Sequence, residues 1–121
     1  MVESGLKHGS YVIQRSITTS EVHRPCSGVW KFNCDGAFHP KDGSAAFGVL
    51  VRDSSGAVVE VNHGKIFVAS ALAAEAWALR IAINMAVDLG ISQAVFEFDC
   101  QQLVNYCTNN ALKFLTGQFN A

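Results

Sequence analysis

The stretch "SALAAEAWALRIAINMAVDLG", residues 70–90, decides the fold, because it predicts one long helix with both of its ends marked. Strong helix formers fill the interior, Ser70 stands where an N-cap belongs, and Gly90 stands where a C′ residue belongs. The next stretch, "ISQAVFEFDC", alternates apolar and polar residues as a strand does. A helix that links two strands of one sheet makes a right-handed crossover, so this strand should run parallel to an earlier one.

Upstream of the helix, the pattern predicts three antiparallel strands. Apolar and polar residues alternate from Trp30 to Asp35, which puts Asp35 on the polar face, at the end of the first strand. The Asp-Gly pair there is also typical of a plain turn. "AAFGVLVRDSSGAVVEVNHGK", residues 45–65, consists of two apolar runs joined by "DSSG", which favours a hairpin. Gly48 within it either packs closely or leaves room for a neighbour to approach.

The remaining segments complete an α/β architecture. Residues 1–28 lack a sustained period and are interpreted as a tail or linker, although "GSYVIQRSITTSEV" could hold a short strand. A second helix should start near Gln101. We therefore expect one domain over residues 29–121, built on a mixed sheet of three antiparallel strands, a helix, a parallel strand and a helix.

Composition limits the classes of function. Nine Lys and Arg residues oppose ten Asp and Glu residues among 121, so no global basic field attracts polyanions, and a nucleic acid would have to be recognised locally. Half of the residues are hydrophobic, which predicts a packed core. No apolar run is long enough to cross a membrane and no secretory signal is recognisable, so we expect an intracellular protein without a membrane partner.

Cysteines and histidines do not suggest a metal or disulfide framework. Cys26, Cys34, Cys100 and Cys107 form no C-x-x-C pair and lie in apolar surroundings, as free reduced thiols do. The four histidines are too scattered for paired zinc ligands.

One acid lies on the wrong side of the long helix. At about 100° per residue, Arg80, Asn84 and Asp88 form a polar stripe, whereas Glu75 points with Leu72 and Leu79 toward the core. Interaction with the helix dipole is worth only about 0.3 to 1 kcal/mol. An unpaired buried carboxylate costs several kcal/mol. We therefore expect either a cation near Glu75 or a wetter environment than the pattern indicates.

Two further acids stand where they could join Glu75. Asp35 and Asp99 end the first and fourth strands, so the three carboxylates converge if those strands are neighbours. Clustered carboxylates repel one another unless a multivalent cation neutralises them. Oxygen ligands without His or Cys favour Mg²⁺ or Mn²⁺. This is the ligand chemistry of two-metal phosphodiester hydrolysis.

Four motifs in order carry a resemblance to a known family: "FNCDGAF", "GVLVRDSSG", "ALAAEAWALRIAINMAVDLGI" and "AVFEFDCQQLVN". Over about residues 29–110 the chain resembles the plant ribonuclease H-like domain, found in free-standing proteins and in non-LTR retroelement reverse transcriptases. The resemblance implies hydrolysis of the RNA strand of an RNA/DNA hybrid. It also implies that Asp35 is shared between two metal ions and that Glu75 and Asp99 hold one of them.

The resemblance also shows a departure. Family members continue into a fifth strand, a His-containing segment and a C-terminal helix with a fourth acidic ligand, whereas this sequence ends at Ala121. We therefore expect a C-terminally truncated domain. Lys31, Lys41, Arg52 and Lys65 are candidates for phosphate contacts, although solvated surface charge is the commoner role of such residues.

Two alternatives remain open. The chain could be a non-catalytic nucleic-acid-binding relic of a retroelement-derived domain, or an interaction protein that associates through apolar surface left uncovered.

Overall fold

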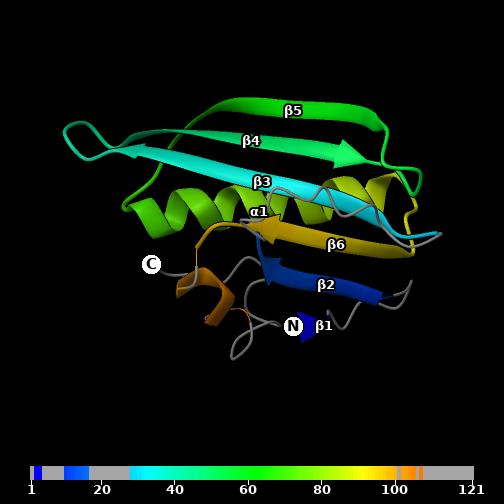
Figure 1. The fold of residues 1–121 in the computed structure, drawn as a ribbon. Helices are drawn as coiled ribbons and strands as arrows, with labels where there is room; N and C mark the ends of the chain where they lie inside the picture. The colour runs from blue at the N-terminus through cyan, green and yellow to red at the C-terminus, as the bar shows by residue number, and fades with distance from the viewer. Residues whose placement is uncertain (1, 4–9, 17–27, 101, 106, 108–121) are drawn as a thin grey trace.

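The computed structural model describes residues 2–3, 10–16, 28–100, 102–105 and 107. One mixed sheet lies in front of one long helix (Figure 1). The elements are β1 (Val2–Glu3), β2 (Ser10–Arg15), β3 (Trp30–His39), β4 (Ser44–Arg52), β5 (Val58–Phe67), α1 (Ala71–Asp88) and β6 (Gln93–Phe98). Their order across the sheet is β1-β2-β6-β3-β4-β5.

The predicted α/β topology is confirmed. Strands β3, β4 and β5 pair antiparallel, and β6 pairs parallel with β3 after the crossover through α1. Asp53 and Gly56 close the predicted hairpin, since the Gly56 N–H donates to the Asp53 carbonyl and Gly56 takes a φ of 89°. Helical structure resumes at residues 102–105, in agreement with the predicted second helix.

The limits of α1 are also as predicted. The Ser70 hydroxyl accepts from the Ala73 N–H at 3.0 Å, and Gly90 turns the chain out of the helix with a φ of 70°. The side of α1 that faces the sheet is mostly alanine, with Leu79 and Ile83, and is buried. Small side chains let the helix lie close to the strands. None of the helices described is long and apolar enough to cross a membrane.

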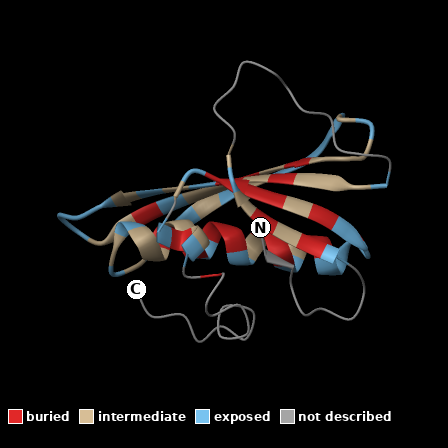
Figure 2. Cartoon of the chain, turned by 60° about the horizontal axis from the view of Figure 1, so that its bottom comes forward, coloured by how far each residue is buried: buried red, intermediate tan, exposed pale blue. Residues whose placement is uncertain are grey.

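The core lies between α1 and the sheet (Figure 2). Alternate residues of β3 and β6 enter it, among them Phe32 and Phe96, whose rings stack at 4.9 Å between centroids. The intervening residues point to the opposite side of the sheet, which we call the outer face. Asp35 is exposed on this face, as the alternation predicted.

Two local predictions need correction. Asp35 does not end its strand, and Asp35-Gly36 is not a turn, because β3 stays paired with β4 from Lys31 to His39 and the chain turns only after that. Residues 10–15 lie in the segment interpreted as a tail or linker; they form β2, in agreement with the alternative of a short strand there, and pair parallel with β6. Tyr11 and Ile13 are buried in the core, so the apolar half of this short strand is what holds it in the sheet. The rest of the predicted tail lies largely outside the described residues.

Candidate metal-binding acids and their surroundings

Strand β3 and helix α1 meet closely at Gly36. A Cβ atom at Gly36 would lie 2.7 Å from the backbone carbon and oxygen of Ala74 and 2.9 Å from the nitrogen of Glu75. A glycine is therefore required for this approach. The Gly36 N–H donates to Oε1 of Glu75 at 3.2 Å, so the glycine next to Asp35 also holds the carboxylate of Glu75.

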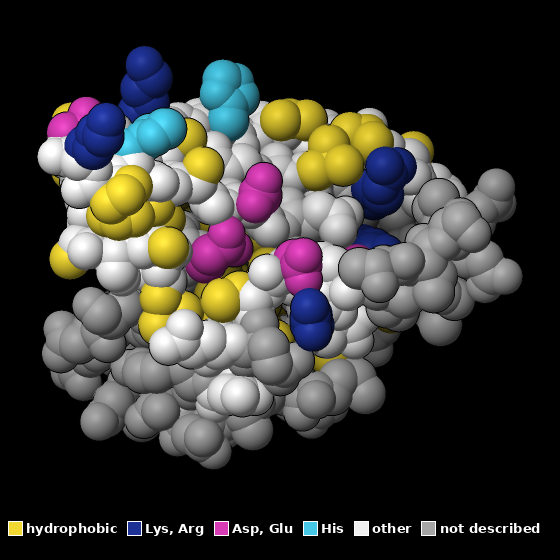
Figure 3. All heavy atoms as spheres, turned by 60° about the vertical axis from the view of Figure 1, so that its left-hand side comes forward, with side chains coloured by type: hydrophobic (Ala, Val, Ile, Leu, Met, Phe, Trp, Pro, Cys, Tyr) yellow, Lys and Arg dark blue, Asp and Glu magenta, His cyan; other side chains and the backbone are white. Residues whose placement is uncertain are grey.

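Strands β3 and β6 part near the same point. Their parallel pairing runs from Trp30 with Ala94 to Asn33 with Glu97. Asp35 and Asp99 each follow the last pair by two residues, so both lie where the strands part, Asp35 within β3 and Asp99 just beyond the end of β6. Acidic side chains gather on the side of the molecule where the two strands part (Figure 3).

Electrostatics link Glu75 to both aspartates. Burial raises the pKa of Glu75 to about 7, the hydrogen bond from Gly36 opposes this shift, and the negative charges of Asp35 and Asp99 add to it. Both aspartates are therefore near enough to Glu75 for their charges to act on its carboxylate. Near neutral pH, Glu75 is divided between its charged and neutral forms.

The acids do not form a coordination cluster. Among the residues whose positions are described, no group of three or more His, Cys, Asp or Glu side chains is close enough to hold a metal ion. Asp99 instead pairs with Arg15 of β2, with Nε 3.1 Å from Oδ1, and both side chains are more than half exposed. The assignment of Asp35, Glu75 and Asp99 as metal ligands therefore stays a prediction, although three carboxylates fit the chemistry of a hard divalent cation.

A fourth carboxylate, Glu97, has a different environment. It is 4% exposed and accepts from three side chains of neighbouring strands. Lys31 Nζ lies 2.9 Å from Oε1, Gln14 Nε2 lies 2.9 Å from Oε2, and Asn33 Nδ2 lies 3.4 Å from Oε1. The alternation in the sequence separates Glu97 from the apolar residues of its strand but does not reveal this buried network, since all three donors come from strands far away in the chain.

The four cations suggested for phosphate contacts divide into two groups. Lys31 is committed to Glu97, and Arg52 donates to the carbonyl of Gly56 at 3.1 Å. Lys41 and Lys65 are exposed and engage no partner in the part of the chain that the structure describes.

The thiols are structural. Cys34, Cys100 and Cys107 are free, as predicted, whereas Cys26 lies outside the described residues. Burial, with the charges of Glu75, Asp35 and Glu97, raises the pKa of Cys34 far above its ordinary value. Burial raises the pKa of Cys107 to about 12. Neither thiol is suited to act as a nucleophile.

Comparison with protein families gives a match over most of the chain. A family model described as reverse transcriptase-like matches residues 33–115, a range that includes Asp35, Glu75 and Asp99. No curated protein sequence matches the chain significantly.

Solved structures resemble the fold. The ribonuclease H1 of the halophilic archaeon Halobacterium salinarum is 28% identical with a TM-score of 0.59, over 77% of this chain and 64% of that one. The N-terminal ribonuclease H domain of a Mycobacterium tuberculosis protein is 23% identical with a TM-score of 0.62, over 75% and 76%. The foamy viral protease-reverse transcriptase, solved with double-stranded DNA, is 18% identical with a TM-score of 0.51, over 74% and 57%. The chain thus spans less than two thirds of the archaeal enzyme.

Proposed function

The chain belongs to the reverse transcriptase-like family, and we propose that it is a ribonuclease H-type domain that hydrolyses the RNA strand of an RNA/DNA hybrid. The observation that carries the proposal is the contact of Glu75 with β3 at Gly36, the residue next to Asp35. The pairing of β3 with β6 ends close to this contact, and Asp99 lies just after β6. A family match could persist without a working site. Three acids brought to one opening of the sheet are a more specific feature.

In this proposal, Asp35, Glu75 and Asp99 bind divalent cations. Mg²⁺ or Mn²⁺, two ions in a complete site, would activate water and stabilise the departing oxygen of a phosphodiester. Asp35, exposed on the outer face, would be the ligand nearest the substrate. Glu75, held by the Gly36 N–H, would keep its carboxylate in place at the inner side of the opening. Recognition would rest on the backbone and 2′-hydroxyl groups of the hybrid rather than on base sequence.

Cleavage of an end-labelled RNA/DNA hybrid tests this activity directly. We expect cleavage in Mg²⁺ or Mn²⁺, none in EDTA, and a loss on the order of 100-fold or more in Asp35→Asn, Glu75→Gln and Asp99→Asn. Asp88→Asn is the matched control, because Asp88 is an exposed acid at the far end of α1. Equal cleavage by Asp35→Asn and Asp88→Asn would refute the assignment of the site.

Ion binding gives a test that needs no turnover. Calorimetric titration with Mn²⁺ should detect a site that weakens in Asp35→Asn and is unchanged in Asp88→Asn. If both variants bind as the unmodified protein does, these acids are not the ligands.

A second candidate is a domain that binds hybrids without cleaving them. The ion pair between Arg15 and Asp99 favours it, since the guanidinium already occupies one of the predicted ligands. This candidate predicts hybrid binding with no cleavage in Mn²⁺. Cleavage that is restored or increased by Arg15→Gln would instead show that the pair competes with the ion.

A further inference from the structure

The outer face of β3, β4 and β5 has an unusual arrangement of side-chain sizes. The strand register aligns three rows across it: Asp35, Gly48 and His63; Ala37, Ala46 and Lys65; His39, Ser44 and Phe67. The middle strand contributes only small residues. The β5 members of the rows, His63, Lys65 and Phe67, are all exposed. Small residues therefore form a shallow trough, with His63, Lys65 and Phe67 as its β5 rim.

Gly48 is not explained by packing or by backbone conformation. A Cβ atom there would meet nothing within 4 Å, and Gly48 is not among the glycines with positive φ. Among the residues that the structure describes, no neighbouring group therefore fills the space next to Gly48. Two strand spacings, about 9.6 Å, separate Asp35 from His63 across this open position.

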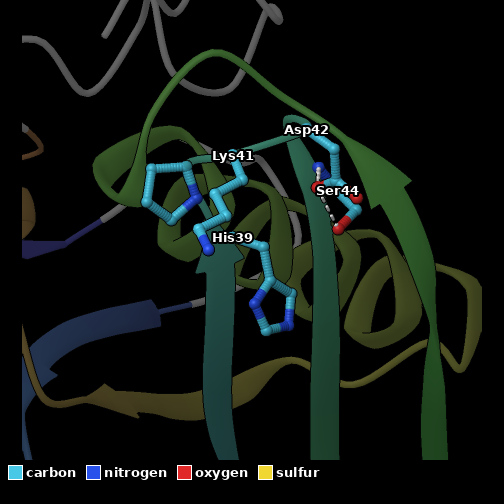
Figure 4. A pocket seen from close by; sticks show the side chains of 5 residues that line it. His39, Lys41, Asp42 and Ser44 are labelled. Atoms are coloured by element: carbon cyan, nitrogen blue, oxygen red, sulfur yellow. Dashed lines mark hydrogen bonds between the residues drawn. The ribbon is translucent and has the colours of Figure 1, made fainter.

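The trough extends to the β3–β4 turn. His39 and Lys41 reach over the side of the sheet opposite α1, beside an open hollow of about 570 Å³ (Figure 4). Asp42 also lines this hollow, but its carboxylate accepts from the N–H and hydroxyl of Ser44 at 2.9 and 2.7 Å and so serves the turn. Histidine and basic side chains lie along the edge above the acidic side chains (Figure 3).

An aromatic ring completes the rim. Phe67 is 79% exposed, and it follows Lys65 on the same face of β5. Cationic groups beside an exposed ring, along a smooth groove, match the two needs of a nucleic-acid strand, which are phosphate neutralisation and base stacking. Asp35, on the β3 side of the trough, belongs to the proposed catalytic site.

We propose that this trough binds one strand of a nucleic acid and leads its backbone to Asp35. The backbone lies over Gly48 and Ala46, Lys65 and His63 contact phosphates, and Phe67 stacks on a base. The inference rests on the proposed function only where it says that the bound strand leads to Asp35. Binding of the strand in the trough does not depend on that function, since the trough needs no bound ion.

Fluorescence anisotropy with a labelled RNA/DNA hybrid, measured in EDTA, tests the surface without turnover. In about 50 mM salt, Lys65→Ala should weaken binding several-fold and lower the slope of log affinity against log salt by about one. Phe67→Ala should weaken binding about tenfold. Arg80→Ala is the matched control for charge, because Arg80 is an exposed cation on the polar stripe of α1.

Gly48→Val gives the sharpest variant. A Cβ atom at this position meets nothing within 4 Å, so the fold should be kept and thermal unfolding should confirm it, while hybrid affinity falls at least as far as in Lys65→Ala. If the Gly48→Val variant does not fold, the Lys65→Glu variant takes its place in the test. We expect Lys65→Glu to abolish the salt-dependent binding of the hybrid. Failure of the unmodified protein to bind the hybrid, or binding by Gly48→Val and Lys65→Ala equal to that of Arg80→Ala, would overturn the proposal.

The two proposals fail in different ways. If the hybrid is bound through the trough but never cleaved, the nuclease proposal falls and the trough stands. If the hybrid is cleaved and the trough variants bind and cleave normally, the trough falls and the nuclease stands.

Discussion

Glu97 and Glu75 are both withdrawn from solvent, on opposite sides of the place where β3 and β6 part, and their surroundings differ. Glu97 accepts from Lys31, Gln14 and Asn33, and it lies almost entirely inside the protein. Glu75 accepts from one backbone N–H, and two aspartates act on it with like charge.

The difference separates a structural carboxylate from one suited to bind an ion. A buried charge is tolerated where a cation and hydrogen bonds replace its hydration, as at Glu97. At Glu75 only part of that hydration is replaced, so the site would gain from an added positive charge. If burial alone were the criterion, Glu97 would be chosen as the functional residue. The number of hydrogen-bonding and cationic partners points to Glu75 instead, because Glu75 has fewer of them.

Removing the cation from the satisfied carboxylate should have the largest effect. Lys31→Met leaves Glu97 buried without a positive partner, and we expect the free energy of unfolding to fall by about 3 to 5 kcal/mol. Urea denaturation measures this. Lys41→Met, at an exposed lysine without a partner, should change stability by less than about 0.5 kcal/mol. Adding Glu97→Gln to Lys31→Met should recover part of the loss, and no recovery would contradict a charge-based account.

Gly36→Ala should have the next largest effect, because it disturbs the contact that holds Glu75. The new Cβ would lie 2.7 Å from the backbone of Ala74, so α1 must shift, at a cost of about 2 kcal/mol. Gly48→Ala is the control, since its Cβ meets open space. That variant should be neutral or slightly stabilising. Similar losses of stability in the two variants would show that the close approach at Gly36 is unimportant.

A smaller effect on stability should appear when Glu75→Gln removes the charge of this carboxylate. The folded protein holds the Glu75 proton up to a pKa of about 7, compared with 4.5 as the ordinary value, so stability should fall as pH rises between these values. Partial exposure reduces the effect to about 1 to 2 kcal/mol. Glu75→Gln should therefore gain stability over the unmodified protein by pH 8 but not at pH 4. Glu60→Gln, at an exposed acid, should show no such pH dependence. If the difference in stability between Glu75→Gln and the unmodified protein does not change with pH, the raised pKa of Glu75 is refuted.

Arg15→Gln should have the smallest effect on stability. Its ion pair with Asp99 is exposed, so the free energy of unfolding should change by less than about 0.5 kcal/mol. Mn²⁺ affinity should rise by about twofold to threefold, because a competing cation has been removed. Calorimetry measures this change, with Arg80→Gln as control. A weaker Mn²⁺ affinity in Arg15→Gln would show that Arg15 supports the site instead of competing with the ion.

Much of the fold follows from local patterns. The helix over residues 71–88, its Ser70 cap and the alternation around Asp35 depend on neighbours in the sequence, and periodicity predicts them. The parallel placement of β6 follows from the crossover rule. The reverse transcriptase-like family match agrees with the resemblance seen in the motifs.

What local patterns could not predict depends on distant contacts. Asp-Gly is common in turns, and only the backbone of α1 against Gly36 shows why the pair lies inside a strand here. Residues 10–15 carry too short an alternation to establish a strand until β6 supplies its partner. The partners of Glu97 and Asp99 come partly from that strand, so neither environment was visible in the sequence.

The pairing of β2 with β6 also bears on how the chain folds during synthesis. Gln14 and Glu97, which bond across these strands, are 83 residues apart, so β2 emerges from the ribosome long before its neighbour exists. Closing so large a loop carries an entropic cost, and folding slows when contacts are this distant. We expect the nascent chain to keep Tyr11 and Ile13 uncovered until translation has passed residue 98, which makes this early segment a natural target for chaperones.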